Sequence, residues 1–271
     1  MKNFDKELDF NLATRGIIVA VEDALHLSDE EFAKIRHQGF GASDSSKLLG
    51  VNPFPRGTAE ELLQDKITEY HDEEIGKKAS VRMGKDLEPF IIERTAEYLG
   101  ISKFKPINMY KNPKNGLMVN FDAIIVDETL HNGFIPDEVK TVSFYGVKYY
   151  DYSKAQEVSK EHRPAWTDFS TYNLCDPDGI PEDFEPNAEE LVRYVTYQAS
   201  LSGIPVYYYS QLQQQIKFVD APFGFLTALD TKTWTFYMFA IKRDPITIDN
   251  IEKIATKLYA KLKIVKGIKD E

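Results

Sequence analysis

The sequence is poor in cysteine, since Cys175 is the single one among 271 residues. One cysteine excludes an internal disulfide and an iron–sulfur cluster held by the chain's own thiolates. The five histidines are scattered and lack the short spacings of a zinc site. No apolar run reaches the roughly 18 residues of a membrane span, and the charged residues 1–7 lack the apolar stretch of a signal peptide. We therefore expect a protein of the cell interior.

An excess of positive charge is also missing, because the net charge is −10. This balance is unlike that of a protein that binds nucleic acid through many phosphate contacts. An enzyme that acts on a phosphate polymer needs only a local basic track, and a bound divalent ion supplies part of the charge. The favoured track consists of Arg56, Lys77, Lys78, Arg82 and Lys85. A second set, on a C-terminal helix, is expected to be a solvated face: Lys253, Lys257, Lys261, Lys263 and Lys266.

The organisation of the chain indicates one domain over residues 1–271, because no repeat or linker divides it and 42% of its residues are hydrophobic. The sequence predicts a helical N-terminal part (about 28–100), a sheet core (about 104–242) containing a long polar insert (about 151–187), and a C-terminal helix (about 249–266). After the insert we expect a helix at 188–202, then strands at 204–211, 215–219 and 233–242. The expected fold class is α/β (α+β), with a mixed central β-sheet flanked by helices.

Charged residues stand inside two apolar runs that are typical of neighbouring strands. Residues 117–126 contain Asp122, and residues 134–142 contain Glu138 and Lys140 after an Asn-Gly turn signal. The side-chain period of two places Glu138 and Lys140 on the same face. Isolated charges are costly in such runs, so they persist where they are paired or bound to a cation. This face is the candidate site.

These residue types suit metal-assisted attack of water on a phosphodiester. Asp122 and Glu138 offer hard oxygen ligands for Mg²⁺, which is usually held by one or two carboxylates plus substrate phosphate oxygens. Lys140 would polarise the attacking water and offset charge on the phosphoryl oxygens. The alternative is an ordinary salt bridge between strand neighbours, and the triplet alone does not decide between the two.

A second candidate feature precedes the strands. A helix that opens with a capping box at Ser28 is expected to carry Arg36 in its last turn. A short helix, bounded by Gly41 and Gly50, is expected to begin at Ser43. Its free N–H groups and the guanidinium of Arg36 would together suit a phosphate. The alternative is that Ser43 caps its own helix and Arg36 is a solvated cation at a helix C-terminus.

The order of these motifs resembles a known family. Asp122, followed after sixteen positions (138 minus 122) by Glu138-x-Lys140, resembles the PD-(D/E)xK restriction-endonuclease-like core, with Pro136-Asp137 interpreted as a decoy. Within that superfamily the chain resembles the YqaJ-like viral recombinases, relatives of the phage lambda exonuclease. Four further segments carry the resemblance, in the family's order over about residues 36–210: RHQGFGAS at 36–43, GASDSSKLLG at 41–50, MGKDLEP at 83–89, and Gln198.

The resemblance implies a metal site and a catalytic lysine. Asp122, Glu138, the backbone carbonyl of Val139 and Glu88 are the implied metal ligands, and Lys140 acts beside them. Without the family, Glu88 is an acidic residue in the first turn of a helix, where the helix dipole stabilises it.

The resemblance also implies DNA contacts. Arg36 and Ser43 hold the 5′ phosphate of a DNA end, and Arg82 and Lys85 contact the DNA. Gln198 lies on the active-site floor as part of the catalytic set. Without the family, Gln198 is equally consistent with a satisfied core amide.

The implied activity is that of a Mg²⁺-dependent deoxyribonuclease, a 5′→3′ exonuclease on double-stranded DNA ends in phage-type recombination. Two ions per site are implied, with Mn²⁺ as a substitute. A ring of three subunits, a single-strand annealing protein as partner and the cytoplasm of a bacterium or phage-infected host are further implications. One alternative is an endonuclease of restriction or repair on the same core, which would cut closed circular DNA. The other is a non-catalytic DNA-binding or regulatory protein, which would be expected to have lost Asp122, Glu138 or Lys140.

Overall fold

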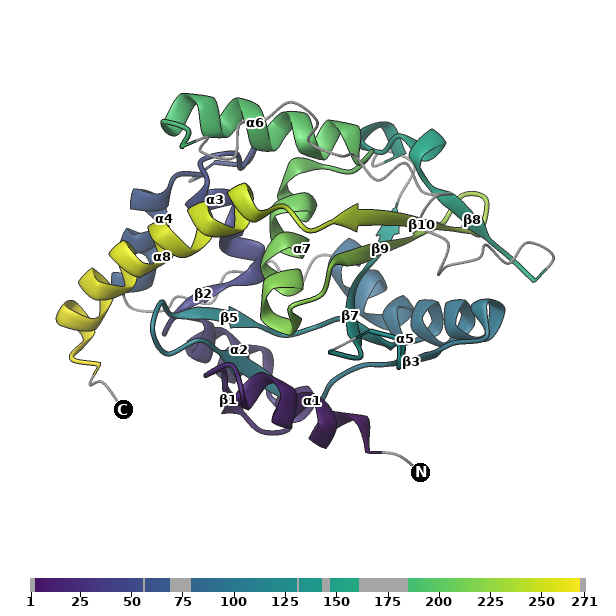
Figure 1. Ribbon diagram of the computed structural model, residues 1–271, viewed down its shortest axis with the longest axis horizontal. Coiled ribbons are helices and arrows are strands. Elements are labelled where there is room, and N and C mark those ends of the chain that lie inside the picture. Colours follow the sequence, from purple (N-terminus) through teal and green to yellow (C-terminus); the bar gives the residue numbers. More distant parts are fainter. Residues whose placement is uncertain are drawn as a thin grey trace.

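The computed structural model describes residues 3–55, 57–68, 79–130, 132–142, 147–160 and 185–268. Two sheets form the framework, and helices surround them (Figure 1). The six-stranded sheet has the order β3-β6-β7-β9-β10-β8. Strands β7 and β9 pair in parallel, and the other pairs of this sheet are antiparallel. The prediction of a mixed sheet flanked by helices is therefore confirmed.

The strands of the larger sheet are β3 (Ser102–Phe104), β6 (Ala123–Val126), β7 (Phe134–Val142), β8 (Gln156–Val158), β9 (Phe223–Asp230) and β10 (Thr235–Lys242). The four-stranded sheet, in the order β1-β4-β5-β2, contains β1 (Ile18–Val21), β2 (Phe40–Gly41), β4 (Met109–Lys111) and β5 (Leu117–Val119). The α-helices are α1 (Phe4–Ala13), α2 (Asp29–Arg36), α3 (Ser45–Leu48), α4 (Ala59–Ile67), α5 (Ala79–Leu99), α6 (Ala188–Leu201), α7 (Val206–Val219) and α8 (Pro245–Lys266). Short 3-10 turns are η1 (Ala24–His26), η2 (Ala42–Asp44), η4 (Val147–Tyr149) and η5 (Tyr152–Lys154).

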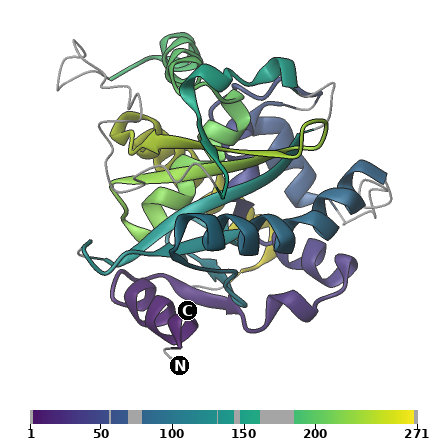
Figure 2. The ribbon, with the colours of Figure 1, turned by 90° about the vertical axis from the view of Figure 1, so that its right-hand side faces the viewer.

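Strand β7 separates two hydrophobic cores. Helix α7 packs on one face of it and helix α5 on the other (Figure 2). Val139 belongs to the core that contains Ile91 of α5, whereas Val142 belongs to the core that contains Leu212 of α7. Because neighbouring side chains of a strand point to opposite faces, each face of β7 meets a different helix.

Helix α7 contradicts the predicted strands at 204–211 and 215–219, and that prediction is wrong. The segment is rich in aromatic and β-branched residues, which locally favour strands. However, Leu212, Ile216 and Val219 recur at helical spacing, and all three are fully buried. A Cβ on Gly224 of β9 would lie 3.0 Å from side-chain atoms of both Leu212 and Ile216, so this glycine lets α7 lie close to the sheet.

The apolar run at 117–126 is two strands rather than one. Strand β5 pairs with β4 and β2 in the smaller sheet, and β6 pairs with β3 and β7 in the larger one. The chain leaves regular strand pairing between Val119 and Ala123. Asp122 thus stands at the junction of the two sheets, immediately before β6, and not in the middle of a strand.

Several elements were not predicted. Helix α1 and strand β1 precede residue 28, and β8 lies within the expected insert, most of which falls outside the described residues. Strand β9 was also missed. All eight of its residues are buried, so it lacks the alternation that identifies a half-exposed strand.

Helix boundaries agree in part with the sequence. The capping box at Ser28 and the helix that starts at Ala188 are confirmed, and the pattern Thr58-Ala-Glu-Glu61 forms a capping box at the start of α4. Helix α8 begins at Pro245 and not at about 249, because the Asp244 side chain caps it and proline is well tolerated in the first turn. Helix α5 extends from Ala79 to Leu99 with Pro89 inside it.

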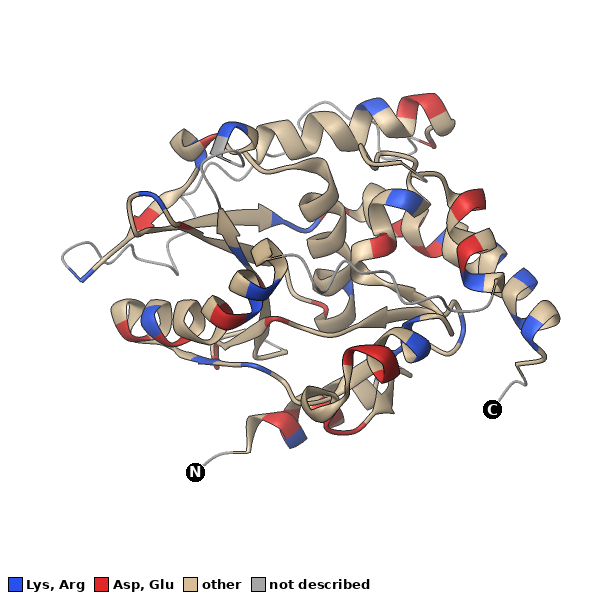
Figure 3. Ribbon diagram, turned by 180° about the vertical axis from the view of Figure 1, so that it is seen from behind, with Lys and Arg blue, Asp and Glu red and all other residues tan. Residues whose placement is uncertain are grey.

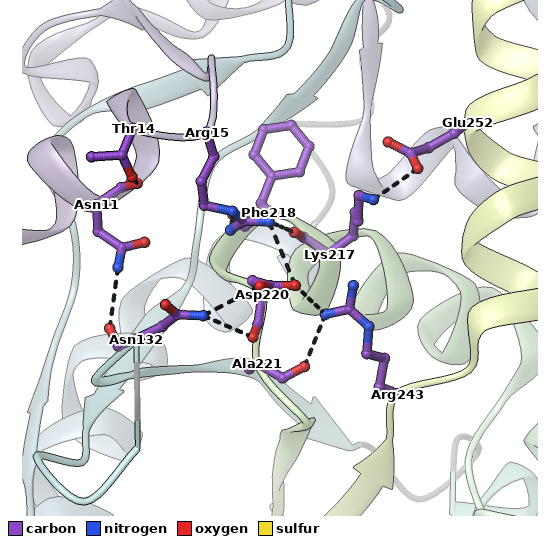
Figure 4. A network of polar contacts seen from close by, with 10 residues as sticks. All are labelled: Asn11, Thr14, Arg15, Asn132, Lys217, Phe218, Asp220, Ala221, Arg243 and Glu252. Atoms are coloured by element: carbon purple, nitrogen blue, oxygen red, sulfur yellow. Dashed lines mark hydrogen bonds and ion pairs between the residues drawn. The ribbon is translucent and has the colours of Figure 1, made fainter.

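A polar network fastens the C-terminal end of α7 (Figure 4). Arg15 donates to the backbone carbonyls of Phe218 and, at 2.8 Å, Lys217, which are helix-end acceptors that need partners. Asp220 follows in the left-handed region, with φ 56°. Its carboxylate lies 2.7 Å from Nη1 of Arg243 and 3.8 Å from Nη2 of Arg15. The network therefore ties α7 to the segment after α1 and to the end of β10.

Charges of both signs are interspersed over most of the ribbon, and basic residues gather in the last turns of α8 (Figure 3). None of the helices in the described ranges is both long and apolar enough to cross a membrane.

Candidate active site

The two faces of β7 separate the candidate motif from its decoy. Asp137 is fully buried on the α5 side, where it pairs with Lys103 and accepts from the Thr227 hydroxyl at 2.8 Å. Glu138 and Lys140 point to the other face, toward α7. The interpretation of Pro136-Asp137 as a decoy is thus consistent with the geometry, because Asp137 lies away from Lys140.

Asp122 bridges the junction of the sheets to β7. Its Oδ2 accepts from the backbone N–H of Val139 at 3.1 Å and from Nζ of Lys140 at 2.9 Å. Its Oδ1 has no hydrogen bond within the described ranges. The bend between β5 and β6 therefore brings Asp122 beside Glu138 and Lys140, as the sequence predicts, and leaves one carboxylate oxygen available.

Glu138 is completely buried and is held by two glutamines of α7. Gln211 donates through Nε2 to Oε1 at 2.5 Å, and Gln215 donates through Nε2 to Oε2 at 2.6 Å. Burial and the nearby charge of Asp122 raise the pKa of Glu138 to about 8, against the opposing effects of Lys140 and Gln215. Glu138 is thus a carboxyl group whose charged form needs a positive partner.

Lys140 lies between the two carboxylates. Its ammonium group contacts Glu138 and lies 5.4 Å from the ring centre of Tyr208. Burial disfavours its charge, but Asp122 and Glu138 outweigh burial and raise the pKa of Lys140 well above its usual value. Lys140 is therefore a protonated hydrogen-bond donor at neutral pH.

Arg36 and Ser43 meet beside this cluster. Nη2 of Arg36 donates to the Ser43 hydroxyl at 2.5 Å, from the end of α2 to the turn η2. Asp44, and not Ser43, accepts from the N–H of Gly41, at 3.0 Å, so the reading of Ser43 as a helix cap does not hold. A Cβ on Gly41 would lie 2.9 Å from Nη2 of Arg36, so the glycine leaves room for the guanidinium.

One cavity joins these groups. Its volume is about 290 Å³, and its lining includes Arg36, Ser43, Asp122, Glu138, Lys140 and Gln211. Asn120 also lines it, and the side-chain Oδ1 of Asn120 is buried without a hydrogen-bond partner among the described residues. Buried polar atoms are almost always paired, so an unpaired one in a residue that lines a cavity is consistent with a ligand.

Glu88 lies close to the cluster but not in the first turn of its helix, so that expectation is wrong. Glu88 lies nine positions after Ala79, where α5 begins (88 minus 79). Its Oε1 contacts Nζ of Lys105 at 2.5 Å. Burial and then Asp122 raise the pKa of Glu88, against the effect of Lys105, which places its carboxyl within electrostatic range of Asp122.

Gln198 is a predicted catalytic residue that does not line the cavity. It is buried on α6 and lines a separate small pocket with Tyr194, Tyr209 and Asp244. The glutamines that reach Glu138 are Gln211 and Gln215, on the following helix. These two glutamines were not predicted, because the aromatic and β-branched residues around them favour strands; their i, i+4 spacing is the signal in the sequence that could have identified them.

The predicted DNA contacts Arg82 and Lys85 lie on α5, away from the cavity lining. Arg82 borders an open depression that also includes Trp234. Lys85 forms an exposed ion pair with Asp29 at 2.7 Å. Arg56, Lys77 and Lys78 of the same predicted track lie outside the described residues.

No group of three or more His, Cys, Asp or Glu side chains in the described ranges is arranged closely enough to hold a metal ion by side chains alone. Two carboxylates, Asp122 and Glu138, nevertheless line one cavity. Mg²⁺ commonly binds through one or two carboxylates and completes its shell with water and phosphate oxygens. The donor set therefore fits such an ion, and a cation would oppose both burial and the charge of Asp122, which raise the pKa of Glu138.

Comparison with known proteins agrees with the fold. A solved alkaline exonuclease (LHK-Exo) from Laribacter hongkongensis has a TM-score of 0.53 and 16% identity, covering 89% of this chain and 96% of that chain. The structure of LHK-Exo in complex with dAMP has a TM-score of 0.52 and 15% identity, covering 88% and 95%. At such low identity the likeness shows the fold alone. A search of curated proteins finds no match.

The model of the YqaJ-like viral recombinase domain matches residues 31–221. This range is more than half of the 271 residues and includes both the Arg36–Ser43 pair and the Asp122, Glu138 and Lys140 cluster. The chain therefore belongs to the YqaJ-like viral recombinase family.

Proposed function

We propose that this protein is a Mg²⁺-dependent deoxyribonuclease that degrades double-stranded DNA from its ends in the 5′→3′ direction, in phage-type recombination. One observation carries the proposal: the Arg36–Ser43 pair and the Asp122, Glu138 and Lys140 cluster line the same cavity. Arg36 suits a terminal phosphate, and the Asp122, Glu138 and Lys140 cluster suits hydrolysis. Their position side by side fits an enzyme that acts on strand ends.

The proposed metal ligands are Asp122, Glu138, the backbone carbonyl of Val139 and Glu88, with room for two ions that Mn²⁺ can replace. When bound, the ions supply an activated water and stabilise charge on the phosphoryl oxygens. Glu138 is presented for this role by Gln211 and Gln215, which fix both of its oxygens. Glu88 would have to exchange its contact with Lys105 for the ion.

The protein's own cations would act on the phosphates. Arg36 and Ser43 would bind the 5′ phosphate, since a guanidinium donates several hydrogen bonds in a fixed plane. Lys140 would hold the attacking water or a phosphoryl oxygen through its protonated Nζ. The side chains of Arg36 and Lys140 are only partly exposed, and charge-assisted hydrogen bonds are stronger where solvent is partly excluded.

Contacts beyond the cavity are part of the same proposal. Lys85 pairs with Asp29 on the surface, and an exposed pair contributes little to stability, so Lys85 can turn to a phosphate at little cost. Arg82, one turn earlier on α5, is proposed to follow the same strand. The family resemblance extends the proposal to a ring of three subunits, a single-strand annealing protein as partner, and work in the cytoplasm of a bacterium or phage-infected cell.

The test uses linear duplex DNA labelled at either 5′ or 3′ end, with and without Mg²⁺, beside covalently closed circular DNA. We expect Mg²⁺-dependent release of the 5′ label first and an intact circle. Lys140→Ala should be strongly impaired, on the order of 10²-fold or more, while the matched control Lys257→Ala, at an exposed lysine of α8, should behave as the parent. Cleavage of the circle would favour the endonuclease alternative. No cleavage of any substrate would overturn the proposed activity, and the sedimentation coefficient tests the trimer.

A further inference from the structure

A row of aromatic side chains leads out of the cavity. Tyr208 lines the cavity, and its ring lies 5.4 Å from Nζ of Lys140. The Tyr207 ring is 4.3 Å from that of Tyr208, and the Phe54 ring is 5.4 Å from that of Tyr207, measured between ring centres. The row thus runs from the first turn of α7 to the loop after α3.

The outer end of this row is exposed. Phe54 is 57% exposed, and Tyr149, in the turn η4, is 59% exposed. The electrostatic effect of Tyr149 reaches this row, since the pKa of the Tyr207 hydroxyl is raised first by burial, then by Tyr208 and then by Tyr149. Single exposed aromatic residues are ordinary on a protein surface, but a row that is continuous with a cavity is not explained by chance exposure.

The charges around the row are suited to a strand of nucleic acid. Nζ of Lys148 lies 5.0 Å above the Tyr149 ring, so a cation stands beside the exposed aromatic surface. The whole chain carries a net charge of −10, so phosphate attraction alone is a weak means of holding DNA. Aromatic side chains bind nucleobases through their faces, without a need for positive charge.

We propose that Phe54, Tyr149 and Tyr207 form a stacking surface for the bases of the single strand next to the cleavage position, with Tyr208 as its inner edge. This inference rests on the proposed function only for the identity of the strand; base binding itself is independent of hydrolysis. The surface would hold the strand in place between successive cleavage steps and make binding depend on the presence of bases.

The test measures binding, by fluorescence anisotropy in EDTA, of two 5′-phosphorylated single strands of equal length. One carries thymine throughout, and the other is abasic at the positions nearest the 5′ end. The variants are Phe54→Leu and Tyr149→Leu, at exposed positions where folding is not at risk. Phe10→Leu is the matched control, because Phe10 is 73% exposed on α1, at the opposite end of α7 (Figure 1). Phe54→Tyr should retain the binding of the parent.

We expect the parent to bind the thymine strand more tightly than the abasic one. Each leucine variant at 54 or 149 should weaken binding of the thymine strand roughly 5- to 150-fold and leave the abasic strand unaffected. Equal binding of both strands by the parent, or unchanged discrimination in Phe54→Leu, would overturn the inference. A parent that prefers bases but hydrolyses no DNA would overturn the proposed activity and leave the stacking surface standing.

Discussion

Gly41 offers a test of the phosphate pocket that does not touch the cation itself. Replacement by alanine would put a Cβ 2.9 Å from Nη2 and 3.0 Å from Nε of Arg36. Comfortable contacts between such atoms are about 3.5 Å or longer, so the guanidinium must retreat by roughly half an ångström or more. It is the flexible end of a long side chain, and Gly41 has a φ of −66°, which alanine adopts readily. Gly41→Ala should therefore fold normally.

The size of the effect follows from the contact that is displaced. Arg36 donates to Ser43 at 2.5 Å, and the same fork is proposed to hold the 5′ phosphate. A hydrogen bond to a charged group contributes about 1.5–3 kcal/mol, or roughly 10- to 150-fold in affinity. Arg36→Ala should lose all of it. Gly41→Ala should lose part of this contribution, so the preference for 5′-phosphorylated over 5′-hydroxyl ends should fall about tenfold.

The assay compares kcat/KM on the two kinds of end, together with the melting temperature. Gly84→Ala is the matched control, because its Cβ would find Thr141 Oγ1 at an ordinary 3.5 Å and alanine favours helix α5. If Gly41→Ala discriminates between the ends as the parent does while Arg36→Ala does not, the added Cβ does not displace the guanidinium of Arg36 from the phosphate. If both variants keep the preference, the phosphate binds elsewhere.

Three further perturbations test the site and the fold around it. Lys140→Ala should lower turnover on the order of 10²-fold or more while Mn²⁺ binding persists in calorimetry; near-parental digestion would remove Lys140 from the mechanism. Asp122→Asn should raise the Mg²⁺ concentration needed for half-maximal activity, and an unaltered titration would favour a purely structural pair. Burial acts against the charge of Asp44, but Lys66 and Arg36 lower the pKa of Asp44 to about 2. The unfolded chain therefore takes up this proton first, so urea unfolding should reveal a loss of about 2.5 kcal/mol as the pH falls from about 5 to 1. An equally steep acid limb in Asp44→Asn would contradict that assignment.

The features that could be predicted from sequence depend on local patterns. The limits of β7 follow from an apolar run after a turn, and the helix starts at Ser28 and Thr58 follow from capping boxes. The same-face placement of Glu138 and Lys140 follows from the period of a strand. The joining of Asp122 to this pair was predicted from two neighbouring apolar runs and agreed with the family resemblance, whereas its position at a break between two sheets was not predicted.

The features that could not be predicted depend on tertiary packing. The aromatic and β-branched residues of 206–219 favour strands by themselves, and only burial against β9 makes the segment a helix. That error removed Gln211 and Gln215 from consideration and left Gln198 in their place. Strand β9 carries no alternation to detect, because both of its faces are covered.

The buried pair on the far side of β7 has a consequence for how the chain reaches its native register. The side chains of Lys103, on β3, and Asp137, on β7, are both completely inaccessible to solvent, and β6 lies between these two strands. Sliding β7 by a single residue would turn Asp137 toward α7, away from Lys103, and Lys140 toward α5, away from Asp122. A shifted register of β7 is thus disfavoured on both faces of the strand. The buried Lys103–Asp137 pair therefore favours one pairing register for β7, the strand whose opposite face presents Glu138 and Lys140.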